Sequence, residues 1–458
     1  MRTTQTASTP SAVKTGRTTR TRRTTRTTGK TDAARTARTA RARAAVCVCV
    51  CTAALLAGCT AGPDPAAGGG SGGTAKAKNG DTAPLSGKAG AVRHPVPRGR
   101  GSRLPDDLNG DGQRDLVLND LVRAPDDPYG DDPGIGIVYG TAGAGGGLDP
   151  AVRQTLGPRT HGARVDGVLP AAFDAEAVCD LDQDGYGDLI IGTDPPYDGN
   201  GMPPVPLQIL FGGPTGPSGR AVVLRIPGKA RFGNEWPDHP VCGDFDGDGK
   251  VDLAVTASAG QVSFLRGPFT RAGAPRGASA PVPGGGPVLE APAPAADAND
   301  DGYDDLVHSD RARTPGRAGR GELLLGGPEG PGRPGGPYGF KTVTLPPAPT
   351  LPGAGPGSGS GTEQDAGTDQ DAGAEPGAGT GSPGRGKVIT ELLLAADFTG
   401  DGRPDLVTRT HRGETTDLIA LYASSPDGGG AGGAGGATGA GGVTNRPVIT
   451  FSTSIFLG

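Results

Sequence analysis

Short apolar runs rich in β-branched residues recur along the chain, each bounded by Gly, Pro or Asp. Five runs follow an Asp-Leu pair and read DLVL, DLIIG, DLAVT, DLVHS and DLVTR. A second apolar run comes after each of them, at residues 134–140, 205–213, 261–267, 321–327 and 417–423. Runs of this length and composition are typical of strands. The sequence therefore predicts an all-β protein built from repeated strand pairs.

One ten-residue pattern precedes the five Asp-Leu runs. We call its copies loops 1 to 5: Asp107 to Leu116, Asp180 to Leu189, Asp244 to Leu253, Asp297 to Leu306 and Asp397 to Leu406. Every copy has Asp at positions 1, 5 and 9, Gly at position 6 and Leu at position 10. Position 3 is Asn, Asp, Asp, Asn and Thr in turn. Gly at position 6 permits a sharp turn, because it tolerates a positive φ.

The polar positions of these loops predict calcium sites. Hard cations such as calcium take six to eight oxygen ligands, and without a cation several carboxylates would repel one another. We expect up to five Ca²⁺ ions, held by side chains at positions 1, 3, 5 and 9 and by the carbonyl at position 7. The candidate ligands are Asp107, Asn109, Asp111, Gln113, Asp115, Asp180, Asp182, Asp184, Tyr186, Asp188, Asp244, Asp246, Asp248, Lys250, Asp252, Asp297, Asn299, Asp301, Tyr303, Asp305, Asp397, Thr399, Asp401, Arg403 and Asp405.

The residues after each loop exclude an EF-hand. An EF-hand has a bidentate Glu at position 12 and continues into a helix. Position 12 here is Leu118, Ile191, Val255, His308 or Thr408, and a strand is predicted instead.

The spacing of the loops indicates the architecture. Successive first Asp residues are 73, 64, 53 and 100 residues apart, and the last interval contains a low-complexity insert of 41 residues, 346–386. A period near 60 with three or four short strands fits a propeller blade, a small antiparallel sheet that buries its faces against its neighbours. Dockerin and thrombospondin-type calcium repeats have much shorter periods.

At this level the chain resembles the FG-GAP (VCBS-like) repeat family, which includes integrin alpha-chain propellers and many secreted bacterial proteins. The resemblance rests on the five loops and on the turns FGGPTGP (211–217) and LGGPEGP (325–331). It implies a β-propeller of about five to seven four-stranded blades, calcium in the loops, and extracellular binding or adhesion without catalysis. Such propellers usually have seven blades, whereas only five loops are present. Either some blades lack the loop, or the ring is smaller or incomplete.

The N-terminus predicts export. Residues 1–43 carry twelve Lys and Arg and one acid, and an apolar run of fifteen residues (44–58) precedes Cys59. That run is too short for a membrane-spanning helix and suits a signal peptide. Leu56-Ala57-Gly58-Cys59 resembles a bacterial lipobox, which implies lipidation of Cys59 and a place on the outer face of the cell membrane. The alternative is an ordinary signal peptide with a chance cysteine.

Composition divides the chain into a signal peptide (1–58), a flexible tether (59–94) and a propeller (95–458) with low-complexity inserts at 346–386 and 428–442. Removal of residues 1–58 leaves 32 Lys and Arg against 48 Asp and Glu, a net charge near −16. This acidity argues against nucleic-acid partners, and against membrane contact other than through the lipid anchor. The last segment, 446–458, returns to strand character and is expected to close the ring beside the first blade.

Two cysteines, Cys179 and Cys242, remain inside the predicted propeller. They precede loops 2 and 3 by one and two residues, so on strands with a two-residue period they should face opposite ways. The pattern favours small buried apolar residues over a disulfide.

No catalytic constellation is found in the sequence. The five histidines are scattered, and the G-x-S-x-G match at 69–73 lies in the tether, without the strand and helix that such a motif needs. We therefore predict a non-enzymatic protein that binds an extracellular protein or carbohydrate. The alternative is an accessory or sensor module, or a degenerate hydrolase or lyase on the same scaffold. Candidate ligand contacts are Asn234 and Trp236, in one of the variable segments 124–133, 195–205, 230–240 and 271–287.

Overall fold

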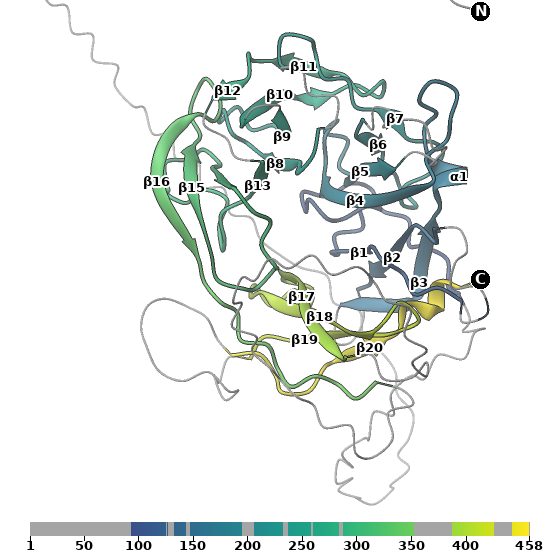
Figure 1. Ribbon diagram of the computed structural model, residues 1–458. Coiled ribbons are helices and arrows are strands. Elements are labelled where there is room, and N and C mark those ends of the chain that lie inside the picture. The colour runs from purple at the N-terminus through teal and green to yellow at the C-terminus, as the bar shows by residue number, and fades with distance from the viewer. Residues whose placement is uncertain are drawn as a thin grey trace, which may run out of the picture. The chain divides into compact units, whose positions relative to one another are not determined.

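The structure is a computed structural model that describes residues 93–124, 126, 132–142, 147–194, 206–231, 237–257, 260–283, 287–351, 387–425 and 442–457. Within these ranges the strands form five antiparallel sheets. The sheets follow one another around a common centre as the blades of a β-propeller (Figure 1). We number the blades 1 to 5 in chain order. The predicted all-β propeller is confirmed, and five blades stand where about five to seven were expected.

The blades contain three, four, five, four and four strands. Blade 1 consists of β1 (Leu116–Leu118), β2 (Ile135–Gly140) and β3 (Leu148–Leu156), and the short α1 (Pro158–His161) follows it. Blade 2 consists of β4 (Ala172–Cys179), β5 (Asp188–Asp194), β6 (Gln208–Leu210) and β7 (Val222–Val223). Blade 3 consists of β8 (Val241–Gly243), β9 (Asp252–Ala257), β10 (Gln261–Phe269), β11 (Pro275–Ala278) and β12 (Val282–Pro283). Blade 4 consists of β13 (Val288–Glu290), β14 (Leu306–Ser309), β15 (Gly319–Leu325) and β16 (Arg333–Phe340). Blade 5 consists of β17 (Ile389–Ala396), β18 (Asp405–Arg412), β19 (Thr416–Tyr422) and β20 (Ile449–Phe451), and the 3₁₀ turn η1 (Thr453–Phe456) follows it.

Each predicted loop occupies the same place in its blade. In blades 2 to 5 the loop joins the first strand to the second. In blades 2, 3 and 5 the residue before position 1 pairs with the Asp at position 9, and the pairs are Cys179 with Asp188, Gly243 with Asp252 and Ala396 with Asp405. Blade 1 differs, because β1 is the terminal strand of its sheet and no described residue forms a strand before loop 1.

The core lies between the blades. Three clusters of buried apolar side chains join blade 1 to blade 2, blade 2 to blade 3, and blade 3 to blade 4. A fourth joins blade 5 to blade 1 and includes Leu116, Val138, Val407, Phe451 and Phe456. This is the burial that a propeller requires, since a single small sheet cannot bury both of its faces alone.

The C-terminal segment closes the ring between blades 5 and 1, as the sequence predicted. Strand β20 is the outer strand of blade 5, where it pairs with β19. The turn that follows contacts blade 1: Val122 N donates to Thr453 Oγ1 (2.9 Å), and Arg153 Nε donates to the Ile455 carbonyl (2.9 Å). The first and last blades are therefore held together by apolar packing and by hydrogen bonds.

The expectation for the two cysteines was wrong. Cys179, the last residue of β4, and Cys242, in β8, form a disulfide with a Cα–Cα distance of 6.5 Å. Figure 1 shows β4 and β8 as neighbours toward the middle of the ring. Adjacent blades present opposite faces to each other, so residues that meet across the interface must point to opposite faces of their own sheets. The opposite registers of the two cysteines, which argued against a bond, are the arrangement that the bond needs.

Several predicted features lie outside the described residues. These are the signal peptide, Cys59, nearly all of the tether, most of both low-complexity inserts, and the candidate ligand contacts Asn234 and Trp236. In the part of the chain that is described, no helix is long and apolar enough to cross a membrane.

Candidate metal centres

The five loops share one backbone framework, built on the Asp at position 1. In every loop this carboxylate accepts hydrogen bonds from the backbone N–H groups of positions 5 and 6. The Gly at position 6 has φ between 76° and 89° in all five copies, as its prediction required. The loop therefore folds around its first carboxylate.

The Asp at position 5 is fixed in a similar way. One of its oxygens accepts from the backbone N–H of position 7 in each loop, at 2.9–3.2 Å. Gln113, Tyr186, Lys250, Tyr303 and Arg403, predicted as carbonyl ligands, thus also orient this carboxylate. A carboxylate offers about four acceptor positions, so these hydrogen bonds leave room for a cation.

The Asp at position 9 is buried in every loop, with at most 1% of its surface exposed. Its carboxylate accepts from the backbone N–H of position 2 in all loops but loop 3. It also accepts from a backbone N–H at or near the end of the strand that pairs with the one after the loop, at 2.8–3.0 Å. These donors are Gly140, Gly212, Gly267, Gly326 and Ser424. Position 9 therefore ties the loop to the end of this neighbouring strand on the loop face, a role that the sequence analysis did not assign to it.

The donor must be glycine at four of these positions because a side chain would clash with the backbone of the loop. A Cβ added to Gly212 would lie 2.3 Å from the carbonyl oxygen of Gly187, at position 8 of loop 2. The same addition at the other three glycines would bring it to 1.9–2.4 Å from the carbonyl at position 8. In blade 5 the residue is Ser424, whose hydroxyl donates to the carbonyl of Pro404, also at position 8. In the sequence, the FGG run at 211–213 marks this close contact, since Gly212 is its first glycine.

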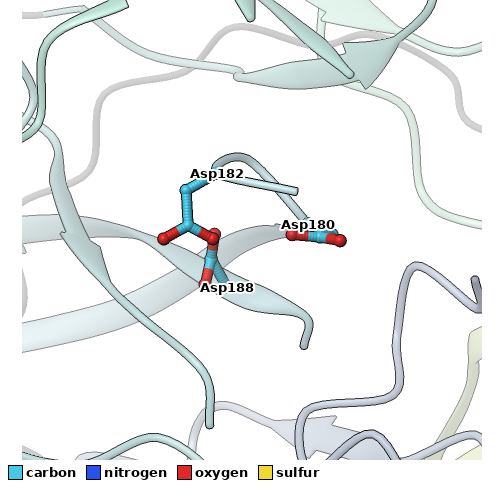
Figure 2. A group of neighbouring side chains, drawn as sticks. All are labelled: Asp180, Asp182 and Asp188. Carbon is cyan, nitrogen blue, oxygen red and sulfur yellow. The ribbon is translucent and has the colours of Figure 1, made fainter. Parts of the chain in front are cut away.

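Three carboxylates come together in loops 2 and 3. One oxygen each from Asp180, Asp182 and Asp188 lie within 4.8 Å of one another, and loop 3 has the same group in Asp244, Asp246 and Asp252. Figure 2 shows the carboxylates of Asp182 and Asp188 close together, with that of Asp180 beside them. The described residues contain no other such group of acids or histidines.

These two groups fit a hard divalent cation. Asp182 Oδ1, Asp246 Oδ1 and Asp252 Oδ2 are buried oxygens without a hydrogen-bond partner. A buried carboxylate oxygen left unpaired is costly, and a cation at the centre of the group would satisfy it. An all-oxygen donor set is the one that calcium prefers.

The electrostatics of the metal-free loops agree. Burial raises the pKa of Asp188 to about 8, and the neighbouring Asp182 and Asp180 add to the shift. Burial and the acids of its own loop raise the pKa of Asp252 to about 7. Crowded, buried carboxylates resist ionisation unless positive charge is supplied.

Loops 1, 4 and 5 have a different position 3. Asn109 donates from Nδ2 to Asp111 Oδ2 (3.2 Å), and Asn299 donates to Asp301 Oδ2 (3.1 Å). In loop 5 the hydroxyl of Thr399 is buried without a partner. These loops keep the predicted framework with one carboxylate fewer, and their remaining acids do not converge as closely.

The loops of neighbouring blades contact one another. Gly187 N donates to the carbonyl of Asp107 (2.8 Å), which joins loop 2 to loop 1. Asp304 N donates to the carbonyl of Asp244 (3.1 Å), and Asp244 N donates to Asp304 Oδ2 (2.7 Å), which joins loop 4 to loop 3. The loops therefore gather on one face of the ring, which we call the loop face.

Comparison with known proteins bears on one blade directly. Residues 241–265 match the sequence model of the FG-GAP repeat. The match covers β8, loop 3, β9 and the first part of β10. No curated protein matches the chain. The chain therefore contains an FG-GAP repeat in blade 3 and folds as a five-bladed β-propeller, and both findings fit a propeller like that of integrin alpha chains.

Proposed function

We propose that this protein is an exported, surface-anchored, calcium-stabilised β-propeller without catalytic activity, and that it binds an extracellular protein or carbohydrate. The observation that carries the proposal is the repeated loop, in which carboxylates converge on the loop face with buried oxygens left unpaired in loops 2 and 3. The rigid ring is then a scaffold for recognition, and the ion is part of the scaffold.

A structural role for calcium follows from how the loop acids are used. The carboxylates at positions 1 and 9 already hold the backbone of the loop and the end of the third strand. An ion that binds them strengthens an existing hairpin and has few ligand positions left for a partner molecule. Extracellular calcium modules bind the ion with a dissociation constant on the order of 0.1–1 mM.

The opposite face of the ring is the better candidate for ligand binding. Strand β5 starts at loop 2 and ends at Asp194, so the variable segment 195–205 begins at the end remote from the loop face. Loops carried on a rigid scaffold are the usual place for recognition.

Six carboxylates that act on one another electrostatically lie toward that opposite face: Asp120, Asp132, Asp174, Glu176, Asp194 and Asp238. We call this group the acidic mouth. Burial and then the charges of Asp132 and Asp120 raise the pKa of Asp174 to about 6. Burial and then the charges of Asp238 and Asp174 raise the pKa of Glu176 to about 7. An acidic rim favours a binding role over a degenerate enzyme, for which a cluster of His, Glu and Tyr would be expected.

Chelation tests the calcium part of the proposal. The melting temperature should fall when a calcium chelator is added and recover with millimolar calcium. The pair Asp246→Ala and Asp248→Ala should remove one bound ion, counted by calorimetric titration. A melting temperature that ignores the chelator, with no metal bound at millimolar calcium, would refute it.

A glycan and protein array, probed with and without calcium, tests the binding part. For a ligand so identified, Trp236→Ala and Asn234→Ala should weaken binding without changing calcium-dependent stability. If a single-loop Asp variant instead loses the ligand while folding normally, calcium bridges the ligand directly and the assignment of faces is wrong.

Anchoring is tested at Cys59. Two acyl chains give stable membrane attachment where one gives marginal binding. Cys59→Ser should therefore move the protein from the membrane to the medium, or cause its precursor to accumulate. An unmodified mature N-terminus in intact-mass data would reject this step and leave the propeller assignments unaffected.

A further inference from the structure

Position 3 separates the five loops into two kinds. It is Asp in loops 2 and 3 and uncharged in loops 1, 4 and 5. At the ligand positions 1, 3, 5 and 9, loops 2 and 3 therefore have four carboxylates each, and the others have three. In both four-carboxylate loops an arginine contacts the extra acid.

Arg271, which belongs to the neighbouring blade, forms ion pairs with loop 2. It lies in the turn between β10 and β11 of blade 3, and its guanidinium reaches into blade 2. Nε pairs with Asp182 Oδ2, and Nη2 pairs with Asp184 Oδ2. The guanidinium lies over the ring of Phe211, 4.6 Å from its centroid.

Arg266, which belongs to the same blade as loop 3, forms an ion pair with that loop. Its Nε lies 3.0 Å from Asp246 Oδ2. The other two nitrogens donate to Ser279 Oγ (3.0 Å) and to the carbonyl of Glu329 (2.8 Å). This guanidinium also lies over an aromatic ring, that of Phe264, at 4.8 Å.

The two contacts share one geometry. Each arginine pairs through Nε with Oδ2 of the position-3 Asp, and in each case Oδ1 of the same carboxylate is buried without a partner. The side chains of Asp182 and Asp246 are only 9% and 7% exposed. The arginine thus occupies the outer oxygen and leaves the inner one for a cation.

We propose that Arg271 and Arg266 are counter-charges that offset the fourth carboxylate and thereby set the cation affinity of loops 2 and 3. The proposal rests on calcium binding in these loops. In loop 2, the four carboxylates at the ligand positions and the Arg271 guanidinium carry a net charge of −3, which equals that of three carboxylates alone. Loop 3 has further cations, because Asp248 also pairs with Arg276 and Lys250. Because calcium affinity depends on the number of charged ligands, Arg271 and Arg266 lower the affinity that a fourth carboxylate would otherwise give to these loops.

The counter-charge has a second effect in the metal-free chain. Without Arg271, the four carboxylates of loop 2 would face one another without its positive charge, and their repulsion would destabilise the loop. Arg271 therefore supports the metal-free state and opposes the calcium-bound state. Since it reaches from blade 3 to blade 2, it also links the blade interface to the occupancy of loop 2.

Arg271→Ala is the test, because this side chain is 52% exposed and its loss leaves the core intact. The variant should have a lower melting temperature in chelator and a larger gain in melting temperature on addition of calcium. Calorimetric titration with calcium should give one site that is about two- to fivefold tighter, the range expected for loss of an exposed charge. Arg164→Ala is the matched control, since this arginine donates to the carbonyl of Gly167 and contacts no loop acid in the described structure.

Asp182→Asn shows whether the arginine acts through this carboxylate. The substitution gives loop 2 the position 3 of loops 1 and 4. In the Asp182→Asn background, Arg271→Ala should change the calcium affinity less than it does alone, and the part that remains comes from its pair with Asp184. An equal change in both backgrounds would overturn the proposal.

The outcomes separate this inference from the proposed function. If the unsubstituted protein binds calcium and Arg271→Ala binds it equally or more weakly, the counter-charge role is refuted and the calcium scaffold stands. If the unsubstituted protein binds no calcium, both are refuted.

Discussion

At the scale of single residues, the recurring FGG turn is explained by one close contact. The glycine after the third strand donates its N–H to the buried Asp at position 9, and the missing Cβ lets its backbone approach the carbonyl at position 8. Ser424 meets the same requirement in blade 5 by donating its hydroxyl to that carbonyl. The motif therefore fastens the loop to the adjacent end of the third strand.

Gly212→Ala tests this explanation. The new Cβ would meet the Gly187 carbonyl at 2.3 Å, so the loop or the strand must shift. We expect a loss of about 1–3 kcal/mol in the free energy of unfolding, as for overpacked sites. Gly339→Ala is the control, since an added Cβ meets nothing within 4 Å there. Equal stability of the two variants in chemical denaturation would contradict the account.

Glu176 in the acidic mouth gives a pH-dependent prediction. Burial and nearby acids raise the pKa of this carboxyl to about 7, against 4.5 for the unperturbed group. The folded chain therefore holds this proton between about pH 4.5 and 7, where the unfolded chain has lost it. Stability falls as the pH rises through that window, because the folded state then binds more protons than the unfolded one.

Glu176→Gln should remove this dependence. At pH 8 the variant should be more stable than the unsubstituted protein, by at most about 1 kcal/mol because the side chain is partly exposed and screened. At pH 4 the two should be equal. Urea denaturation at both pH values measures the difference, and Glu329→Gln, at an exposed position, is the control. A difference that does not depend on pH would point to packing and not to charge.

At the scale of elements, the strands and loops could be predicted because their signals are local. The β-branched run after each loop and the fixed positions of Asp and Gly lie within about fifteen residues of sequence. Strands such as β5, β9 and β18 accordingly begin where the Asp-Leu pairs place them. The counter-charges could not be found in this way, since Arg271 lies 87 residues beyond Asp184 and meets it only through the packing of two blades.

The disulfide shows the limit of reasoning within one strand. The sequence correctly predicted that the two cysteines point to opposite faces of their strands. It did not show how the sheets of neighbouring blades face each other. Neighbouring blades face each other with opposite surfaces, and that relation belongs to the ring. Cysteines of opposite register on adjacent inner strands are therefore candidates for a bond in a propeller, and Cys179 and Cys242 form one.

Removal of the disulfide should weaken the interface of blades 2 and 3. The bond closes a segment of 63 residues, for which the loss of chain entropy in the unfolded state stabilises the fold by about 2–4 kcal/mol. The double variant Cys179→Ala and Cys242→Ala should lose a free energy of unfolding of this size. Mass spectrometry after alkylation, with and without reductant, tests the bond itself. Two alkylated thiols in the unreduced, folded protein would contradict it.

At the scale of the whole molecule, the number of blades depended on how the ring closes. The sequence contains five loops, but it does not show whether the ring also has blades without a loop. Packing decides this: blade 5 meets blade 1 directly, through a shared apolar cluster and the C-terminal turn. Among the described residues, no further sheet lies between them.

Ring closure should therefore depend on the last residues of the chain. Phe456 is 6% exposed and packs in the cluster that joins blades 5 and 1, and a Cβ on Gly136 of blade 1 would lie 2.8 Å from its ring. Phe456→Ala should lower the free energy of unfolding by about 3–5 kcal/mol, the usual cost of a large cavity in a core. Val448→Ala, at a side chain that is 51% exposed, is the control.

The same variant distinguishes a closed ring from a row of independent blades. If blades 5 and 1 support each other, Phe456→Ala should lower the melting temperature of the propeller in one transition, because shared apolar clusters link blades 5, 1, 2, 3 and 4 in series. Hydrogen exchange should then increase in β1 and β19 together, since these strands supply opposite sides of the cluster. Calcium binding to loops 2 and 3, which lie in blades away from this junction, should be unchanged while the chain remains folded. If only blade 5 loosens and blade 1 keeps its protection, the ring is not closed by this contact.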